Sequence, residues 1–199
     1  MKYLLAILII IVCFGFTKLS KEKKPIDKEE SNQSIYDFKI KDIDGNVFDF
    51  KNLKNKVVLI VNVASKCGFT NQYSDLEKLY NKYKENNFIV IGIPSNDFGN
   101  QEPGSNNEIK KFCEGNFNIT FPIMSKVHVK GENIVPLYSF LTNKKIHPKT
   151  GGEISWNFNK FLINKNGKII ERYSSFIKPL SKKITSKIDD LNKGEKNEN

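Results

Sequence analysis

Two long apolar segments, separated by a helical pattern, constrain the fold of this 199-residue chain more than any other feature. They are KVVLIVNVA at residues 56–64 and NFIVIGIPS at residues 87–95. Each has the length of a strand and the uninterrupted apolar character of a strand that is covered on both faces. The stretch between them carries apolar side chains at helical spacing, namely Tyr73, Leu76, Leu79, Tyr80 and Tyr83. We therefore expect strand, helix and strand in succession, with Ser74 and Glu77 in a capping-box pattern.

Hairpin and helix patterns extend this core on both sides. Apolar and polar residues alternate around Asp44-Gly45, and KFLIN and KIIERYS flank Lys165-Asn166-Gly167, so we expect two hairpins, the second with a primed turn. Further expected elements are a helix after the capping box Ser105–Glu108, a strand in TFPIMSKVHV, and helices in VPLYSFLTN and PLSKKITSKIDDLN. Alternating strands and helices, together with antiparallel hairpins, predict an α/β fold with a central mixed sheet flanked by helices.

Both ends of the chain are expected to lie outside the folded domain, which we place at residues 36–193. Residues 1–16 carry an apolar run shorter than the roughly 20 residues that span a bilayer, so they fit a signal peptide, with an uncleaved signal anchor as the alternative. Residues 17–35 predict a disordered linker that could hold a transit segment, and residues 194–199 a disordered tail. The leader predicts entry into the secretory route, with secretion or a plastid-type organelle as destination; a cytosolic form stays open.

The charge and the cysteines exclude several function classes. The chain has 32 basic and 22 acidic residues, a net charge of +10, yet the basic residues are spread thinly and Arg172 is the sole arginine. Without an arginine-rich stripe or zinc-finger spacing, we expect no nucleic-acid binding. The cysteines Cys13, Cys67 and Cys113 form no C-x-x-C pair, so neither a zinc site nor a thioredoxin-type dithiol is expected.

Cys67 occupies the part of the chain where an α/β fold gathers reactive groups. It lies between the strand that ends near Ala64 and the helix that begins near Asn71. Sites in open α/β sheets form at the carboxyl ends of strands, and backbone amides at a helix start stabilise an anion such as a thiolate. The position therefore favours a reactive thiol; the alternative is a small buried hydrophobic side chain.

Three further residues could act beside this thiol. Gln101 lies in the loop after the second apolar segment, and its amide can both donate and accept hydrogen bonds. Trp156, the only tryptophan, offers an indole N–H donor and is followed by Asn157. The structural alternatives are a plain loop residue for Gln101 and, for Trp156, burial beside Phe158 on one face of a strand.

Three segments, NVASKCGFTNQY, IPSNDFGNQEPGS and WNFNKFLINKNG, resemble in this order the motifs of the glutathione peroxidase family. The resemblance covers roughly residues 36–190 and is with cysteine-containing members that act as thioredoxin peroxidases. It implies a thioredoxin fold with an N-terminal β-hairpin, Cys67 as the peroxidatic residue, and Gln101, Trp156 and Asn157 as the groups around it. No metal or organic cofactor is implied.

The resemblance also implies a reaction cycle. The Cys67 thiolate would attack hydrogen peroxide or an organic or lipid hydroperoxide and become a sulfenic acid. Cys113 would resolve this acid to a Cys67–Cys113 disulfide for thioredoxin to reduce; packing against Ile109 is its structural alternative. Disulfide partners need Cα atoms within about 7 Å, and a thiol packed on a helix can start much farther from its partner. We therefore expect the segment around Cys113 to unwind in each cycle.

Other uses of the same thiols stay open at the level of sequence. Glutathione could replace thioredoxin as the reductant, or the chain could be a peroxide sensor that passes its disulfide to a partner protein. Residues 143–155 lack the longer insert of tetrameric relatives, so the resemblance implies a monomer with an open site. We expect a role in antioxidant defence and in the response to oxidative stress.

Overall fold

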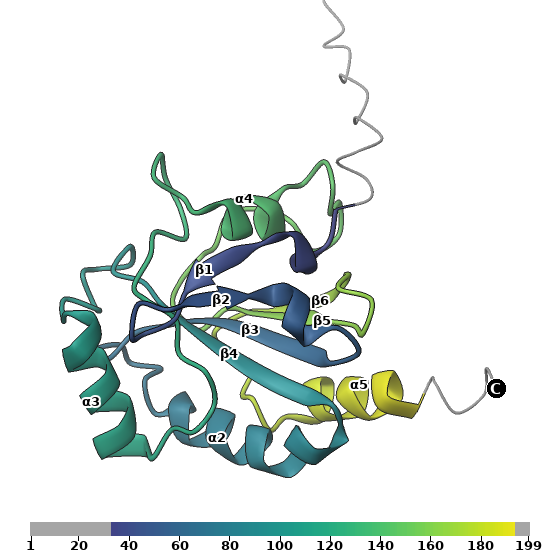
Figure 1. Ribbon diagram of the computed structural model, residues 1–199, viewed down its shortest axis with the longest axis horizontal. Coiled ribbons are helices and arrows are strands. Elements are labelled where there is room, and N and C mark those ends of the chain that lie inside the picture. The colour runs from purple at the N-terminus through teal and green to yellow at the C-terminus, as the bar shows by residue number, and fades with distance from the viewer. Residues whose placement is uncertain (1–32, 194–199) are drawn as a thin grey trace, which may run out of the picture.

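The computed structural model describes residues 33–193, and a four-stranded sheet forms the centre of this part of the chain (Figure 1). The strands lie in the order β4-β3-β5-β6, with bounds β3 Val57–Val63, β4 Phe88–Pro94, β5 Lys160–Ile163 and β6 Ile169–Tyr173. β3 pairs in parallel with β4 and antiparallel with β5, and β5 pairs antiparallel with β6. The predicted mixed sheet is confirmed.

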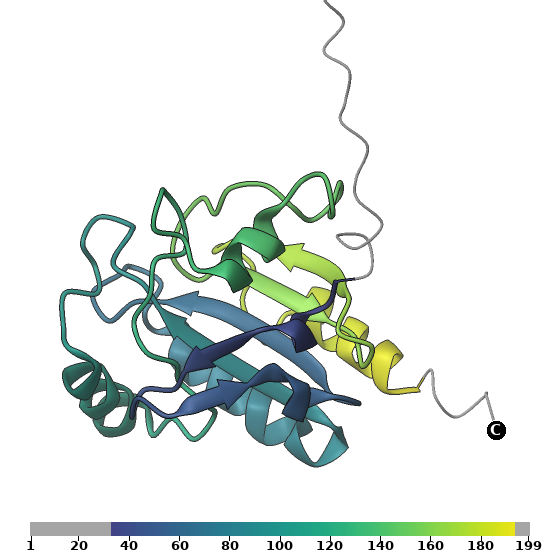
Figure 2. The same cartoon turned by 45° about the horizontal axis from the view of Figure 1, so that its top comes forward.

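Helices lie on both faces of this sheet (Figures 1 and 2). Their bounds are α2 Gln72–Tyr83, α3 Asn106–Phe117, α4 Pro136–Thr142 and α5 Lys182–Lys193. Three short 3-10 helices connect other elements, η1 Ile35–Asp37, η2 Phe50–Leu53 and η3 Lys84–Asn86. α2 and α5 cover one face and α4 covers the other, while α3 packs against α2 near the carboxyl ends of β3 and β4.

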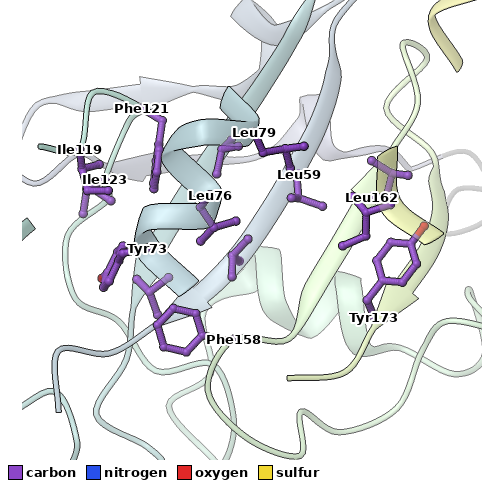
Figure 3. Packing of buried hydrophobic residues seen from close by; sticks show 14 of the residues in the cluster. Leu59, Tyr73, Leu76, Leu79, Ile119, Phe121, Ile123, Phe158, Leu162 and Tyr173 are labelled. Atoms are coloured by element: carbon purple, nitrogen blue, oxygen red, sulfur yellow. The ribbon is translucent and has the colours of Figure 1, made fainter. Parts of the chain in front are cut away.

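Alternate residues of β3 face two separate apolar clusters, and every residue of the strand is buried. Leu59 belongs to the cluster beneath α2 and α5, and Figure 3 shows it beside Leu76 and Leu79 of α2. Ile60 belongs to the cluster beneath α4. The alternation follows from the two-residue period of a strand. A continuous apolar sequence is therefore what a central strand covered on both faces requires, and this prediction is confirmed.

The N-terminal hairpin is also confirmed, with β1 Lys39–Lys41 antiparallel to β2 Val47–Asp49. Its turn is held by Asp42, whose carboxylate accepts hydrogen bonds from the backbone N–H of Asp44 at 3.0 Å and of Asn46 at 2.8 Å. Gly45 adopts φ +88°, a conformation that glycine reaches without steric cost. The Asp-Gly signal in the sequence therefore has a direct structural reason.

The folded part begins slightly before the expected boundary at residue 36. Ser34 caps η1 through a capping box with Asp37, and Ile35 is fully buried. The expected leader at residues 1–16, most of the expected linker, and the tail lie outside the described residues. Among residues 33–193 no helix is long and apolar enough to cross a membrane.

The start of α2 differs from the prediction. The helix begins at Gln72, and its N-cap residue Asn71 makes no side-chain cap, so Ser74 and Glu77 lie inside the helix and form no capping box. Glu77 instead turns to the segment after α3, where its carboxylate accepts hydrogen bonds from Thr120 N–H at 2.9 Å and Thr120 Oγ1–H at 2.5 Å. A tertiary contact thus takes the carboxylate that local sequence assigns to the helix start. The second predicted capping box, Ser105–Glu108 at α3, is confirmed.

Two predictions about strands and turns are wrong. Residues 120–129 form no strand in the described part of the chain but only isolated bridges through Ile123 and Met124, because Pro122 has no N–H to donate to a ladder. The turn between β5 and β6 is not a primed turn, because every primed turn needs positive φ at its first central residue, here Lys165. Gly167 alone has positive φ there, and the Asn164 side chain accepts hydrogen bonds from two backbone N–H groups of the turn.

Candidate active site

Cys67 lies in the loop between β3 and α2, and Thr70 fixes the shape of that loop. Thr70 Oγ1 accepts a hydrogen bond from Cys67 N–H at 2.9 Å and donates one to Ala64 C=O at 2.9 Å. The Cys67 side chain is 8% exposed. Its sulfur accepts a hydrogen bond from Phe69 N–H at 3.4 Å. A backbone donor at the sulfur and a helix start nearby are the features that stabilise a thiolate.

The loop that follows β4 is tied to the Cys67 loop. Lys66 N–H donates a hydrogen bond to Gln101 C=O at 2.9 Å, and Ser65 Oγ donates one to Glu102 Oε1 at 2.7 Å. The two loops meet because β3 and β4 are parallel neighbours whose carboxyl ends lie side by side. The Gln101 backbone oxygen thus links the two loops, a contact that does not depend on its side chain.

Trp156 and Asn157 reach the same place from the segment before β5. Asn157 Nδ2 donates a hydrogen bond to Gln101 Oε1 at 3.0 Å, and Asn62 Nδ2 of β3 donates one to Trp156 C=O at 3.1 Å. Asn157 is buried, whereas Trp156 is 38% exposed and packs against Phe98 with ring centroids 5.8 Å apart. The alternative of Trp156 buried on a strand is wrong, because β5 begins only at Lys160.

Two hydrogen-bond donors of this group remain available to a ligand. Within residues 33–193, neither the Gln101 Nε2 amide nor the Trp156 indole N–H has a protein acceptor. Both flank Gly99, because a Cβ placed on this glycine would lie 3.6 Å from Gln101 Nε2 and 3.7 Å from Trp156 Cη2. The structure thus brings Gln101, Trp156 and Asn157 together beside the Cys67 loop, and two of their N–H donors have no acceptor among the described residues.

A buried lysine that sequence reasoning missed lies behind this group. Lys160 is fully buried, and its ammonium donates hydrogen bonds to Gln72 Oε1 at 2.6 Å and Ile177 C=O at 2.8 Å. Gln72 Nε2 donates to Ser175 C=O at 2.7 Å, and Ser175 Oγ donates to Asn157 C=O at 2.5 Å. Burial lowers the pKa of Lys160 to about 7. A charged residue inside the apolar run KFLI was the signal that could have found it.

Cys113 lies on the buried side of α3 and is a free thiol, as is Cys67. It is 1% exposed and belongs to the same apolar cluster as Ile109, one turn earlier, and Tyr73 of α2. Burial raises the pKa of the Cys113 thiol to about 11, against the neighbouring Tyr73 hydroxyl, which lowers it. The packing expected for its structural alternative is present.

A pocket of about 380 Å³ separates the Cys67 loop from α3. Ser65 and Lys66 line it on the loop side, and Ile109 and Phe112 line it on the helix side. Glu102, from the loop that carries Gln101, completes the wall between them. Among the described residues no group of three or more histidine, cysteine or acidic side chains could hold a metal ion.

Sequence comparisons place this arrangement among known proteins. The family model described as glutathione peroxidase matches residues 35–142. The chain is 57% identical over 146 residues to the glutathione peroxidase-like peroxiredoxin gpx1 of Schizosaccharomyces pombe, covering 73% of this chain and 91% of that protein. It is 46% identical over 155 residues to the hydroperoxy fatty acid reductase gpx1 of Synechocystis, covering 75% and 92%.

The chain is also similar to solved structures. The crystal structure of Trgpx in its apo form is 40% identical, with a TM-score of 0.65, and covers 81% of this chain and 96% of that one. A thioredoxin family protein from Chlorobium tepidum, 18% identical with a TM-score of 0.56, covers 78% and 92% and shares the fold alone. The chain has the expected thioredoxin fold, and it belongs to the glutathione peroxidase family.

Proposed function

We propose that this peroxidase reduces hydrogen peroxide and organic or lipid hydroperoxides through a Cys67 sulfenic acid and a Cys67–Cys113 disulfide that thioredoxin reduces. The observation that carries the proposal is the cluster of Gln101, Trp156 and Asn157. It lies where β3 and β4 end and β5 begins. There the Asn157–Gln101 hydrogen bond lies beside the loop that holds Cys67. The Gln101 Nε2–H and the Trp156 indole N–H have no acceptor among the described residues. The names of the relatives support the substrate class, since one is a hydroperoxy fatty acid reductase.

The first step uses the Cys67 thiolate as the nucleophile. Its sulfur attacks one hydroperoxide oxygen, the O–O bond breaks, and Cys67 becomes a sulfenic acid while water or an alcohol leaves. Gln101 Nε2–H and the Trp156 indole N–H can donate to the peroxide oxygens as negative charge moves onto the leaving oxygen. Asn157 fixes the Gln101 amide, because its Nδ2 occupies the Gln101 carbonyl oxygen and directs the amide nitrogen outward.

The second step uses Cys113, which must leave its buried position. Its thiol attacks the Cys67 sulfur, a disulfide forms, and the sulfenic hydroxyl leaves as water. A thiol held by burial at a pKa of about 11 is almost fully protonated at neutral pH, so it does not compete with Cys67 for peroxide. Opening of α3 therefore serves two purposes, since it brings the thiol within reach and removes the burial.

Thioredoxin is the proposed reductant because the cycle ends in an intramolecular disulfide. Glutathione is the alternative, and it would act on the sulfenic acid directly. A coupled assay with thioredoxin, thioredoxin reductase, NADPH and cumene hydroperoxide separates the two, with glutathione and its reductase run in parallel. We expect turnover with thioredoxin that Cys113→Ser abolishes; turnover with glutathione that survives Cys113→Ser would contradict the proposal.

The proposal extends to the setting in which the enzyme works. The chain acts as a monomer in antioxidant defence during oxidative stress, and residues 1–16 direct it into the secretory route towards secretion or an organelle. The short segment at residues 143–155 supports the monomer, and the apolar run at the start of the chain supports the route. Light scattering of the folded domain tests the first, and a fluorescent reporter fused to residues 1–35 tests the second.

A further inference from the structure

Glu102 is a buried carboxylate between the elements that carry the two thiols, and the cycle described above gives it no role. Its side chain is 1% exposed. We infer that the Glu102 carboxylate accepts the proton of Cys113 as the disulfide forms and passes it to the hydroxyl that leaves Cys67. This inference rests on the proposed two-cysteine cycle.

One oxygen of Glu102 is engaged and the other is not. Oε1 accepts the hydrogen bond from Ser65 Oγ at 2.7 Å, which ties the carboxylate to the loop two residues before Cys67. Oε2 is buried and has no hydrogen-bond partner within residues 33–193. A buried polar atom without a partner destabilises the fold, and more so if it is charged, so its presence calls for a function.

The pocket between the Cys67 loop and α3 places Glu102 between the two elements that carry the thiols. Glu102 lines the pocket together with Ser65 on one side and Ile109 of α3 on the other. Ile109 and Cys113 are four residues apart and therefore lie on the same side of the helix. In the proposed step, α3 opens on this side and the Cys113 thiol passes Glu102 before it reaches Cys67.

The other carboxylate of the pocket, Glu108, and the nearby Lys126 are already engaged, while Lys66 lines the pocket as a cation that lowers the pKa of Glu102. Glu108 Oε2 accepts hydrogen bonds from the N–H and Oγ of Ser105, both at 2.7 Å, in the α3 capping box. Lys126 Nζ donates to the backbone carbonyls of Glu102 at 3.2 Å, Pro103 at 3.4 Å and Gly104 at 2.5 Å, so it holds the loop rather than the carboxylate. Among the described residues that line this pocket, Glu102 is thus the carboxylate with a buried oxygen that has no partner.

The electrostatics of Glu102 suit proton exchange. Burial raises the pKa of its carboxyl, against Ser65, Lys126 and Lys66, which lower it. Burial is the largest cause of the raised pKa of Cys113, and the negative charge of Glu102 raises it further. As a fixed charge, Glu102 would therefore slow Cys113 by disfavouring its thiolate. As the destination of the proton, it loses its charge when the thiolate forms, and the repulsion disappears.

The proposed step balances without an external reactant. The Cys113 S–H bond breaks and its proton moves to the Glu102 carboxylate, while the Cys113 sulfur forms a bond to the Cys67 sulfur. The S–O bond of the Cys67 sulfenic acid breaks, and the leaving hydroxide takes the proton from Glu102 to become water. Cys113 is oxidised, the Cys67 sulfenic sulfur is reduced, and Glu102 ends as it began.

The test compares Glu102→Gln with Glu114→Gln in a single turnover. Glutamine keeps an oxygen that can accept from Ser65 but cannot take a proton. Glu114 is exposed, adjoins Cys113 and also raises its pKa through its charge, which makes it the matched control. Each reduced protein receives about one equivalent of hydrogen peroxide and is quenched and alkylated at intervals. Mass spectrometry then follows the Cys67 sulfenic acid and the disulfide separately.

We expect Glu102→Gln to form the sulfenic acid normally and the disulfide about 10²-fold more slowly, the usual size of a general-base effect. The slowed rate should rise about tenfold per pH unit as the thiolate fraction grows, and Glu102→Asp should recover part of it. Glu114→Gln should form the disulfide at the wild-type rate or faster, since it only removes a repelling charge.

Two results would overturn the inference. If Glu102→Gln forms the disulfide as fast as wild type or faster, Glu102 is a fixed charge and accepts no proton. If Glu102→Gln loses sulfenic acid formation as well, the residue positions the Gln101 loop instead. A wild-type protein that forms the sulfenic acid but never the disulfide is a different outcome, because it contradicts the two-cysteine cycle itself.

Discussion

Cys67 and Cys113 belong to one apolar cluster, yet the chain holds them in different ways. Cys67 lies in a loop fixed by Thr70, with the backbone N–H of Phe69 directed at its sulfur. Cys113 lies inside a helix, and burial raises its pKa to about 11. Both thiols are buried, so the comparison teaches that the donors directed at a sulfur, rather than its exposure, distinguish the two positions. In the proposed cycle, the Cys67 sulfur reacts in the closed fold, and the Cys113 sulfur reacts only after α3 opens.

Serine substitutions should separate the two thiols most strongly. Cys67→Ser should reduce peroxide consumption to the uncatalysed rate, because no other thiol of the domain is positioned as a nucleophile. Cys113→Ser should still consume about one equivalent of peroxide and then stop, since the sulfenic acid cannot be resolved. Stopped-flow consumption of hydrogen peroxide measures both. If Cys67→Ser keeps the initial burst, the two thiols have been assigned the wrong way round.

Removal of the Gln101 amide should affect Cys67 alone. Gln101→Ala deletes the Nε2 donor and the acceptor of Asn157, so we expect sulfenic acid formation to slow about 10²–10³-fold. Alkylation of Cys113 in the reduced protein should stay at the wild-type rate, because Gln101 makes no contact with α3 in the described hydrogen bonds. Equal slowing of both reactions would mean that the variant loosens the whole domain.

The buried Lys160, which lies behind the group beside the Cys67 loop, should make the stability of the protein depend on pH. Its pKa is about 7 in the folded protein because of burial and about 10.4 when unfolded. Between these values the unfolded chain binds the extra proton, so raising the pH favours the folded state. The free energy of unfolding should rise towards pH 10 relative to Lys160→Met, by at most about 1.4 kcal/mol per pH unit. Urea unfolding at several pH values measures it, and parallel curves for both proteins would contradict the assignment.

The α3 cap should change the access to Cys113 by the smallest amount. Ser105→Ala removes the capping box and should destabilise the closed helix by about 1 kcal/mol. The open population, and with it the rate of Cys113 alkylation, should rise roughly fivefold. Ser34→Ala is the control, since Ser34 forms the same capping box on η1. Faster alkylation in both variants would point to a general loss of stability rather than to opening of α3.

The sequence predicts the sheet well because its strongest signals are local. The apolar runs of β3 and β4 and the Asp44-Gly45 turn each depend on neighbours a few residues away. The capping box at Ser74 fails for the opposite reason. Glu77 is drawn to Thr120, 43 residues later in the chain, and no local pattern contains that partner. Pro122 argues against the predicted strand, since proline has no backbone N–H to donate to a neighbouring strand.

The candidate site divides along the same line. Cys67, Gln101 and Trp156 could be found because each lies in a recognisable motif next to a strand, after β3, after β4 and before β5 respectively. The sequence does not show that Gln101 and Asn157 share a hydrogen bond, because they come together only when β3 brings its neighbours side by side. Lys160 and Glu102 were missed because charged residues are usually exposed, and only the fold shows that these two are buried.

The most direct test of the account is the state of the two cysteines after about one equivalent of hydroperoxide and no reductant. Intact mass spectrometry and peptide mapping of the alkylated protein measure it. We predict a protein lighter by two hydrogens, with Cys67 and Cys113 in one disulfide and neither alkylated. A protein heavier by one oxygen on Cys67, with Cys113 still open to alkylation, would contradict the two-cysteine cycle and leave Cys113 as a packing residue.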